Sequence, residues 1–308
     1  MTATVWDEEF FRRRASGDTS EPPVEPAVEI PVMPEYATIA ELLLARADDD
    51  NTALLFEDSR WTWRELVQEA AVRSALLQEL RPADRPWHVG VLLENTPEYI
   101  FLIAGAALCG ATVVGINPTR RGAELAGDIQ RTDCAFVVTD AAYGHLLDGV
   151  QDHRNAFPQN EVLKNLLIFD AGSTDYAARL ERNLGAVPTA TVEGLNARTI
   201  LLLLFTSGST GAPKAVICST GRWAFVCQVT PIKFTADDVA YNAMPIFHGN
   251  ALMSALGPCL ANGAAFAMRR KFSASGFGPD IRRFGATFFN YVGRTLAYVL
   301  AQPECPED

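Results

Sequence analysis

Residues 201–216 read LLLLFTSGSTGAPKAV, an apolar run that changes abruptly into a loop of glycines and hydroxyl residues before becoming apolar again. Gly208 and Gly211 tolerate positive φ, so the loop can fold tightly and direct successive backbone N–H groups into one concavity. Pro213 stiffens the end of the loop, and Lys214 adds a positive charge. Further donors are the hydroxyls of Thr206, Ser207, Ser209 and Thr210. The stretch therefore predicts a cradle for a polyphosphate or another anion with many oxygens.

The loop differs from the P-loop of nucleotide kinases and GTPases, which ends in Gly-Lys-Ser/Thr. Here Pro213 precedes Lys214, and Ala215 stands where a magnesium-binding hydroxyl would be. A flexible surface loop is the alternative interpretation, because Ser, Gly and Thr are common in such loops. The apolar segments on both sides read as buried strands, which favours a binding loop.

Outside this loop, apolar strands alternate with amphipathic helices. The predicted helices lie at 38–47, 62–80, 97–109, 121–132 and 141–150, and the predicted strands at 88–95, 111–116, 134–140, 163–170, 199–205, 214–219 and 238–247. Residues 52–63 read as a hairpin that turns at Glu57 to Ser59. This alternation predicts an α/β fold of layered, mostly parallel sheets with helices on both faces. The helix–glycine–strand order of 97–116 recurs at 251–268, which suggests two similar sheets.

Changes in composition divide the chain into three regions. Residues 1–35 form an acidic, proline-rich segment that predicts a flexible arm. Residues 36–195 are expected to form a first α/β subdomain, and residues 196–308 a second one that contains the anion loop. The loop-rich stretch 170–198 is expected to mark the join.

Overall composition fits a globular protein, with 48% hydrophobic and 20% charged residues. The net charge of −11 argues against a general nucleic-acid surface but not against one local anion site. Six cysteines include no CxxC pair, and there are four histidines, so a zinc site is not expected. Most cysteines lie in apolar runs, as expected for small buried side chains in a reducing cytoplasm.

Two uncharged stretches, 99–119 and 251–268, have roughly the length of a membrane span. Glycines interrupt both, so we interpret each as a buried helix followed by a strand, not as a transmembrane helix. The N-terminal sequence has no apolar core of signal-peptide length. We therefore expect a cytoplasmic protein without a transmembrane span, for which contact with a membrane surface stays open.

The stretch FTSGSTGAPKAV resembles the signature loop of the adenylate-forming enzymes, which include acyl-CoA synthetases, luciferases and peptide-synthetase adenylation domains. The resemblance runs from about Thr38 to Asp308. MPIFHGNALM is similar to the Pro-x-x-His motif of the CoA ligases. The sequence from RRKFSASGF to the end resembles the very-long-chain and transport-protein-like branch, especially actinobacterial fatty-acyl-CoA synthetases.

The resemblance implies a two-step ligase that uses ATP, Mg²⁺ and CoA to activate a fatty acid. It implies that Thr206 binds Mg²⁺, that Ser207, Gly208, Ser209, Thr210 and Gly211 hold the β- and γ-phosphates, and that Lys214 offsets their charge. His248 would lie at the mouth of the acyl pocket as a second catalytic residue. Tyr291, Val292 and Gly293 are expected either to line the acyl tunnel or to form a strand end and helix start in the core.

Several alternatives remain open at this point. Members of the resembled family continue for roughly another 200 residues, more than a typical domain. Two interpretations of the chain therefore remain: a partial ligase, or a non-catalytic module that binds an acyl chain or a partner. We expect adenylation by residues 1–308 alone to be at least about 1000-fold below that of a full-length relative. A sterol side-chain carboxylate is the second substrate candidate, and an amino-acid adenylation domain is disfavoured because Ile-Phe-His-Gly replaces Phe-Asp-x-Ser.

Overall fold

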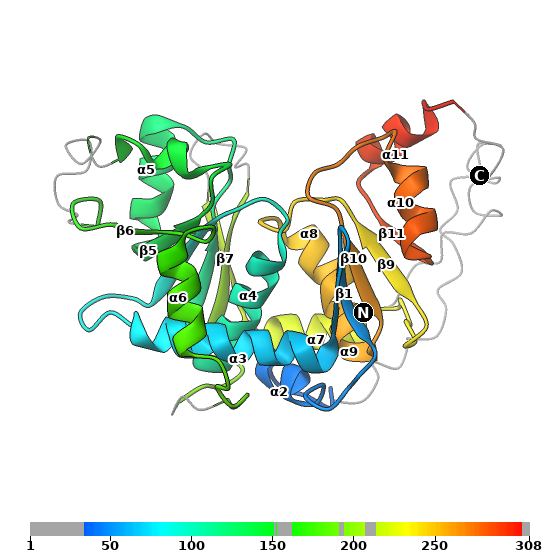
Figure 1. The fold of residues 1–308 in the computed structure, drawn as a ribbon, viewed down its shortest axis with the longest axis horizontal. Coiled ribbons are helices and arrows are strands. Elements are labelled where there is room, and N and C mark those ends of the chain that lie inside the picture. The colour runs from blue at the N-terminus through cyan, green and yellow to red at the C-terminus, as the bar shows by residue number, and fades with distance from the viewer. Residues whose placement is uncertain (1–33, 151, 153–161, 191–193, 207–213, 304–308) are drawn as a thin grey trace, which may run out of the picture. The chain divides into compact units, whose positions relative to one another are not determined.

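The computed structural model describes residues 34–150, 152, 162–190, 194–206 and 214–303. The predicted arm, except for its last two residues, lies outside this range. The described chain forms two sheets with helices packed around them (Figure 1). The predicted α/β class, with layered and mostly parallel sheets, is confirmed.

The first sheet has six strands in the order β6-β5-β3-β4-β7-β8. All neighbouring pairs are parallel except β7 and β8, which are antiparallel. In the order of the sheet, the strands are β6 (Leu167–Asp170), β5 (Cys134–Thr139), β3 (His88–Leu92), β4 (Thr112–Gly115), β7 (Ile200–Thr206) and β8 (Lys214–Ser219).

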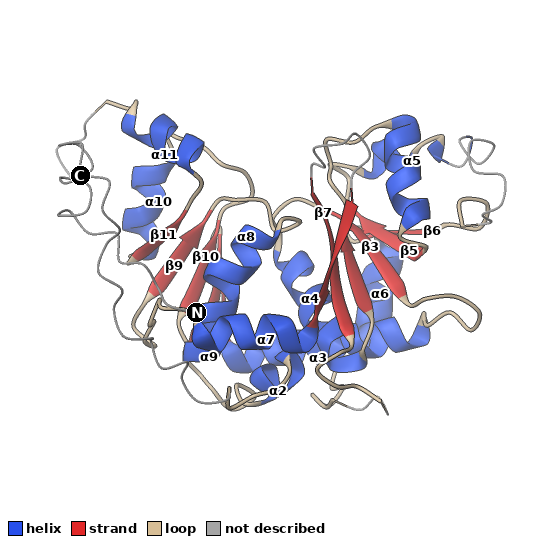
Figure 2. Ribbon diagram, turned by 180° about the vertical axis from the view of Figure 1, so that it is seen from behind, coloured by secondary structure: helices blue, strands red, loops and turns tan. Residues whose placement is uncertain are grey.

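The second sheet has five strands in the order β11-β9-β10-β1-β2. Only the β1–β2 hairpin at its edge is antiparallel. Its strands are β11 (Phe288–Asn290), β9 (Val239–Asn242), β10 (Ala265–Met268), β1 (Thr52–Phe56) and β2 (Ser59–Thr62). Figure 2 shows α4 and α8 between the two sheets, with α5 and α10 on their outer sides.

Some of the described helices start at side chains that accept orphan backbone hydrogen bonds. Thr38 accepts from the Glu41 N–H at 3.2 Å, and Thr62 with Glu65 forms a complete capping box. The helices are α2 (Ile39–Leu44), α3 (Trp63–Glu79), α4 (Pro97–Cys109), α5 (Gly122–Arg131), α6 (Thr174–Arg182), α7 (Thr220–Val229), α8 (Gly249–Ala251), α9 (Gly257–Asn262), α10 (Phe277–Phe284) and α11 (Gly293–Leu300). A 3₁₀ turn, η1 (Gly144–Leu147), and a π-helical segment, η3 (Leu252–Leu256), complete them.

Sheet membership does not follow chain order. The β1–β2 hairpin, from the first predicted subdomain, pairs with β10 through β1. Strand β7, from the second predicted subdomain, pairs with β4 and carries β8 on its other side. Both sheets therefore cross the predicted join between residues 195 and 196. The division of residues 36–308 into two separate subdomains stays a prediction.

The loop-rich stretch 170–198 also contains one short helix, α6, which Ser173 caps through the Tyr176 N–H at 3.1 Å. Three local expectations were wrong, each for an identifiable reason. Residues 141–150 contain only the turn η1, which stops at Leu147 because Asp148 is extended, and Gly149 then adopts a left-handed φ of 72°. The strand expected at 238–247 ends at Asn242, as described below. Strand β8 is not buried, because it forms the edge of its sheet.

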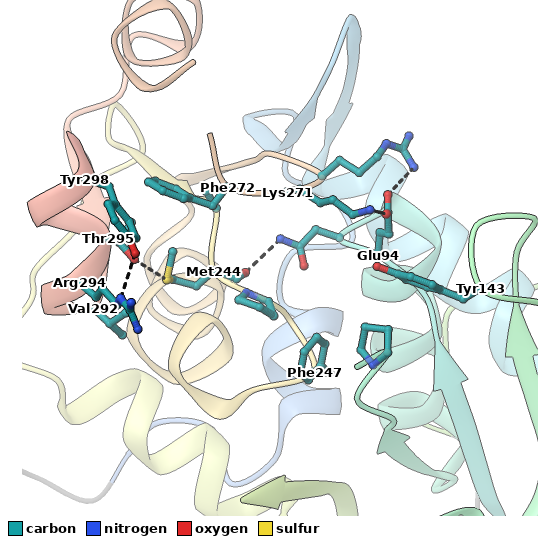
Figure 3. A pocket seen from close by; sticks show the side chains of 15 residues that line it. Glu94, Tyr143, Met244, Phe247, Lys271, Phe272, Val292, Arg294, Thr295 and Tyr298 are labelled. Carbon is teal, nitrogen blue, oxygen red and sulfur yellow. Dashed lines mark hydrogen bonds and ion pairs between the residues drawn. The ribbon is translucent and has the colours of Figure 1, made fainter. Parts of the chain in front are cut away.

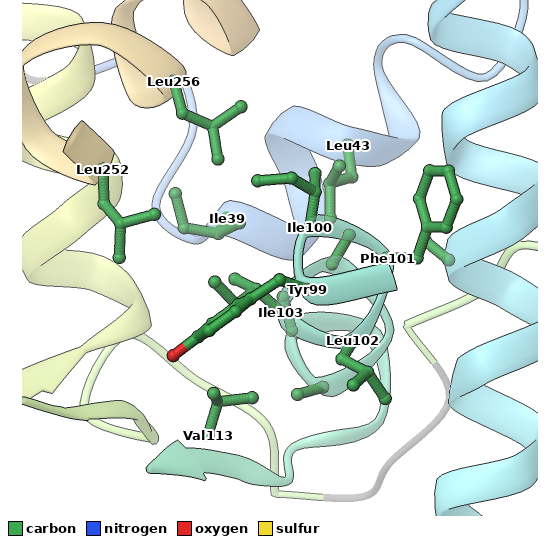
Figure 4. Close-up of a cluster of buried hydrophobic side chains, with 14 of the residues drawn as sticks. Ile39, Leu43, Tyr99, Ile100, Phe101, Leu102, Ile103, Val113, Leu252 and Leu256 are labelled. Carbon is green, nitrogen blue, oxygen red and sulfur yellow. The ribbon is translucent and has the colours of Figure 1, made fainter. Parts of the chain in front are cut away.

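The core forms where the helices between the two sheets meet. Figure 4 shows side chains of α4 in contact with those of α2 and η3. The helix–glycine–strand repeat is present twice in the same geometry, because Gly110 ends α4 at φ 81° and Gly263 ends α9 at φ 78°. Both values lie in the left-handed region that glycine adopts without steric cost. Each glycine is followed by a central parallel strand, β4 or β10.

No helix within the described ranges combines the length and the apolar character needed to cross a membrane. The first uncharged stretch forms α4, which has 13 residues, followed by β4.

A Gly105→Ala substitution is expected to destabilise the protein, although alanine normally favours a helix interior by about 1 kcal/mol over glycine. An added Cβ would lie 2.7 Å from the Arg73 Cβ, 2.9 Å from the Ser74 N and 3.0 Å from the Ala70 O. These are mainly backbone atoms of α3, so the two helices would have to separate, at a cost of about 1–3 kcal/mol. Urea unfolding measures the change, and Gly293→Ala, with nothing within 4 Å, is the matched control. An unchanged or higher midpoint for Gly105→Ala would contradict the expectation.

Candidate functional site

The ends of the glycine-rich loop lie opposite each other at the carboxyl edge of the six-stranded sheet. Thr206 is the last residue of β7, Lys214 is the first of β8, and the two are register partners. The Thr206 Oγ1 lies 3.5 Å from the Lys214 carbonyl oxygen, and both residues are exposed. The residues between them lie outside the described part of the chain. They include the other members of the predicted phosphate cradle: Ser207, Gly208, Ser209, Thr210 and Gly211. The structure therefore brings together the two residues that close the loop.

His248 belongs to the other sheet. It follows β9 in a turn where its N–H donates to the Pro245 carbonyl at 3.2 Å, and it precedes α8. The strand stops at Asn242 because the Asn242 side chain bonds to the backbone of Met244 and because Pro245 has no N–H to extend the ladder. This early strand end is the reason why His248 sits on a loop.

The loop that carries His248 packs directly onto the six-stranded sheet. A Cβ added to Gly115, the last residue of β4, would lie 3.0 Å from the Phe247 O and 3.2 Å from the Phe247 Cα. One added to Gly249 would lie 3.5 Å from a methyl of Leu204, two residues before Thr206. The carboxyl ends of β4, β7 and β9 therefore meet, and they bring His248 to the region where the glycine-rich loop begins.

The surroundings of the His248 ring lower its pKa, because partial burial disfavours the charged imidazolium. The ring packs against Phe247 at 4.4 Å between centroids, although the residue as a whole remains exposed. The lowered pKa favours the neutral form of the imidazole. It can donate or accept a hydrogen bond there, but it does not supply a fixed positive charge.

We expect an NMR titration of His248 to give a midpoint below the ordinary value of about 6.5. Because the folded state binds this proton less tightly than the unfolded state does, the group's contribution to stability falls as the pH drops below about 6.5. The imidazole C2–H signal measures the titration, and His248→Gln identifies it among the four histidines. A midpoint at or above the ordinary value would contradict the burial argument.

A cavity of about 350 Å³ opens where the carboxyl ends of both sheets converge (Figure 3). Its walls follow β3, β4, β5, β9, β10 and β11 in the chain, which is where ligands bind in open parallel sheets. The lining residues are Glu94, Asn95, Pro118, Tyr143, Ala243, Met244, Pro245, Phe247, Arg270, Lys271, Phe272, Val292, Arg294, Thr295 and Tyr298.

Of the three residues predicted to line an acyl tunnel, Val292 lines this cavity. Tyr291 instead stacks on Phe289 at 5.3 Å between ring centroids, and Gly293 begins α11. Val292 and Tyr291 are both nearly half exposed, so neither is buried in the core. The roles of all three residues in substrate binding stay predictions.

Charged side chains on the cavity wall were missed from the sequence. The Glu94 carboxylate, only 4% exposed, pairs with the Lys271 ammonium and lies 3.7 Å from the Arg270 guanidinium. The Lys271 Nζ also lies 5.6 Å from the centre of the Tyr143 ring. Glu94 follows β3, Tyr143 follows β5, and Arg270 and Lys271 both follow β10. For the charged residues, the signal in the sequence was a polar residue directly after an apolar run, as in VLLEN and AFAMRRK.

The cavity is positively charged in an acidic protein. Arg270, Lys271 and Arg294 face a single carboxylate, that of Glu94, among its described lining residues. Arg294 donates from Nε to the Tyr298 hydroxyl at 3.0 Å, which fixes the guanidinium at the wall. An apolar cavity with this rim suits a ligand that has an apolar body and an anionic group.

The fold and the position of the cavity define an α/β protein whose ligand site lies at the carboxyl edges of parallel strands. A family profile described as AMP-binding enzyme matches residues 44–308. The chain therefore belongs to the AMP-binding enzyme family, which confirms the resemblance.

Among its relatives, steroid-22-oyl-CoA synthetase of Rhodococcus jostii is 48% identical over 277 residues, which cover 89% of this chain and 48% of that protein. The medium/long-chain-fatty-acid–CoA ligase FadD17 of Mycobacterium tuberculosis is 40% identical over 280 residues, covering 89% and 52%. The solved N-terminal domain of FACL13 from M. tuberculosis has the same fold, with a TM-score of 0.73 at 21% identity over 87% of this chain and 66% of that one. The chain spans about half the length of these curated relatives.

Proposed function

We propose that this chain carries the substrate-activating site of an ATP-dependent acid–CoA ligase. The observation that carries the proposal is the pairing of Thr206 with Lys214 at a carboxyl strand edge, with the His248 loop of the other sheet packed beside it. Two relatives named as CoA synthetase and CoA ligase support the same reaction class.

In the proposed first step, a carboxylate oxygen of the acid attacks the α-phosphorus of ATP. The bond from that phosphorus to the bridging oxygen breaks, and pyrophosphate leaves. Negative charge builds up on the leaving group, so a preorganised cation and hydrogen-bond donors stabilise the transition state most effectively there. We assign the cation to Lys214, and the donors to the predicted cradle from Thr206 to Gly211.

In the proposed second step, the CoA thiol attacks the acyl carbonyl carbon, and the bond to AMP breaks. The products are a thioester and AMP. We assign His248 to the mouth of the acyl pocket, where its neutral ring adds no charge beside the reacting carboxylate. A neutral imidazole there can orient the acid by a single hydrogen bond.

The described residues are compatible with a magnesium ion that is coordinated mainly by the phosphates of ATP. They contain no group of three His, Cys, Asp or Glu side chains placed to hold a metal. Magnesium keeps several waters and takes only one or two protein ligands beside substrate phosphates. The exposed Thr206 hydroxyl is our proposed ligand, and a bound Mg²⁺ would supply charge neutralisation on the phosphates.

We propose a fatty acid or another apolar carboxylic acid as the substrate, because most walls of the cavity are apolar and its rim is positive. Tyr291, Val292 and Gly293 remain candidates for contacts with the acyl chain. A sterol side-chain carboxylate is the second candidate, favoured by the name of the relative at 48% identity. We place the reaction in the cytoplasm, and contact with a membrane surface would give access to such acids.

Exchange of labelled pyrophosphate into ATP, measured with short and long fatty acids and with a sterol carboxylate, tests the proposal. Acid-dependent exchange supports the first step, and the preferred acid identifies the substrate class. If folded protein binds an acid by calorimetry but shows no exchange with any of them, the chain is a non-catalytic acyl-binding module, and the ligase proposal fails.

A further inference from the structure

The two halves of the proposed site come from different sheets, so their relative position needs a physical link. Thr206 and Lys214 end β7 and begin β8 in the six-stranded sheet. His248 follows β9 in the five-stranded sheet. If the sheets shifted against each other, His248 would move relative to the loop that is proposed to hold the phosphates. The ion pairs of Glu94, after β3, with Arg270 and Lys271, after β10, cross between the two carboxyl edges but do not reach the loop that carries His248.

Asn95 links the His248 loop to the six-stranded sheet. It follows β3 of that sheet, and its side-chain amide reaches two backbone segments of the other sheet. Its Nδ2 donates to the Met244 carbonyl and to the Arg269 carbonyl, each at 3.0 Å, and its Oδ1 accepts from the Ile246 N–H at 3.0 Å. Met244 and Ile246 lie four and two residues before His248.

These hydrogen bonds lie in a protected place. Asn95 is only 5% exposed, so water does not compete for its partners, and each loss would leave a buried backbone group unsatisfied. The pattern also requires an amide. Two carbonyl oxygens need donors, and one N–H needs an acceptor, a combination that an aspartate of the same shape cannot provide.

The other polar contacts of the described His248 loop come from the five-stranded sheet or from α11, whose Thr295 Oγ1 donates to the Met244 Sδ at 3.5 Å. Asn242 bonds to Met244 from the end of the same strand, and Asn290 bonds to Asn242 and Asn250 from β11. They shape the loop but do not tie it to the sheet that carries Thr206. Gly115 adds a steric stop against Phe247, without a hydrogen bond that would resist separation.

We infer that Asn95 is the positioning residue that holds His248 in place relative to the phosphate loop. The inference rests on the proposed function, because the position of His248 relative to the phosphate loop matters only if the two act in the proposed reaction. It extends the proposal by naming a residue that touches neither the phosphates nor the acid and acts through the backbone of residues 244–246.

The test compares Asn95→Asp and Asn95→Ala with Thr112→Val. Thr112 is a matched control, since it is 6% exposed and its Oγ1 donates one hydrogen bond to the Ile200 carbonyl at 2.8 Å, at the opposite edge of the same sheet. Amide hydrogen exchange is the first readout. Both Asn95 variants should exchange about tenfold faster in residues 244–248, and the control should not.

Acid-dependent pyrophosphate exchange is the second readout. A shift of about 1 Å in a reacting geometry costs up to about a hundredfold in rate, so kcat should fall about 10- to 100-fold in the Asn95 variants. The KM for ATP should stay within about twofold, because the phosphate loop is on the unshifted sheet. Asn95→Asp keeps the shape of the side chain and so separates positioning from loss of volume.

Unchanged exchange in residues 244–248, or faster exchange spread evenly over the whole chain, would overturn the inference. So would a fall in kcat that Thr112→Val reproduces. These outcomes differ from a failure of the ligase proposal, which would appear as no activity in the unsubstituted protein. In that case the hydrogen-exchange comparison alone still decides whether Asn95 holds the loop.

Discussion

Replacing Lys214 with alanine is expected to lower acid-dependent pyrophosphate exchange by about 10²- to 10³-fold. Lys214 is the first residue of β8 and is exposed at the sheet edge, so its loss removes charge from the site and leaves the core intact. Negative charge on the departing pyrophosphate increases from the ground state to the transition state. An interaction that strengthens in the transition state lowers kcat when it is removed.

The matched control is Lys233→Ala. Lys233 is also an exposed lysine of the described chain, and it precedes β9 at the end distant from His248. The Lys233→Ala substitution removes the same charge from the protein without changing the glycine-rich loop. Equal losses of exchange in the two variants would indicate a general electrostatic effect and would contradict the assigned role of Lys214. Circular dichroism before the assay confirms that both variants are folded.

An Arg73→Met substitution is expected to cost about 3–5 kcal/mol of stability, the largest structural effect among our predictions. The Arg73 side chain is 8% exposed and pairs with both Glu69 and Glu98. The Tyr176 hydroxyl donates to Glu98 at 2.5 Å. This network joins α3, α4 and α6, and removing its only cation would leave Glu98 nearly buried and uncompensated.

Urea unfolding of Arg73→Met measures this cost, and the double variant Arg73→Met/Glu98→Leu tests its origin. When both charges of a buried pair are removed together, the desolvation penalty disappears as well. We therefore expect the double variant to recover much of the lost stability. If it were no more stable than the single variant, the cost would arise from the lost contact of the guanidinium with the Phe101 ring, 5.0 Å from its centroid, and not from the stranded carboxylate.

Local signals predicted most of the fold. The cap at Thr38, Pro97 at the start of α4 and the hairpin turn after Phe56 depend on residues within one or two turns of the chain, and all three are present. The pairing of Thr206 with Lys214 was equally accessible, because a short loop between two strands brings its ends together. Such features are determined by neighbours in the sequence.

The remaining features depend on pairings between distant strands. The exposure of Val216 and Ile217 follows from the edge position of β8, which no local pattern reveals. Glu94 and Asn95 read as ordinary loop residues after β3. Their partners, Lys271 and Met244, lie about 150 residues or more away in the chain and become neighbours only through the arrangement of the sheets.

Gly221 illustrates the same limit. In the sequence it reads as a weak position at the start of a helix. In the structure an added Cβ would lie 2.5 Å from the Ala197 Cβ and 2.6 Å from the Ala197 O, so only glycine fits between the two segments. Glycine lowers the helix propensity at this position, but the close approach of Ala197 leaves no room for a larger residue.

The interleaved sheets have a consequence for how the chain is made. Leu54 of β1 pairs beside Phe266 of β10, so 212 residues separate partners in one sheet (266 − 54). At ribosomal rates of about 5–20 residues per second, the β1–β2 hairpin waits about 10–40 s for that partner. The six-stranded sheet needs nothing beyond Ser219. Synthesis therefore completes the strands of the phosphate-loop sheet first, while the β1–β2 hairpin still lacks its partner strand β10.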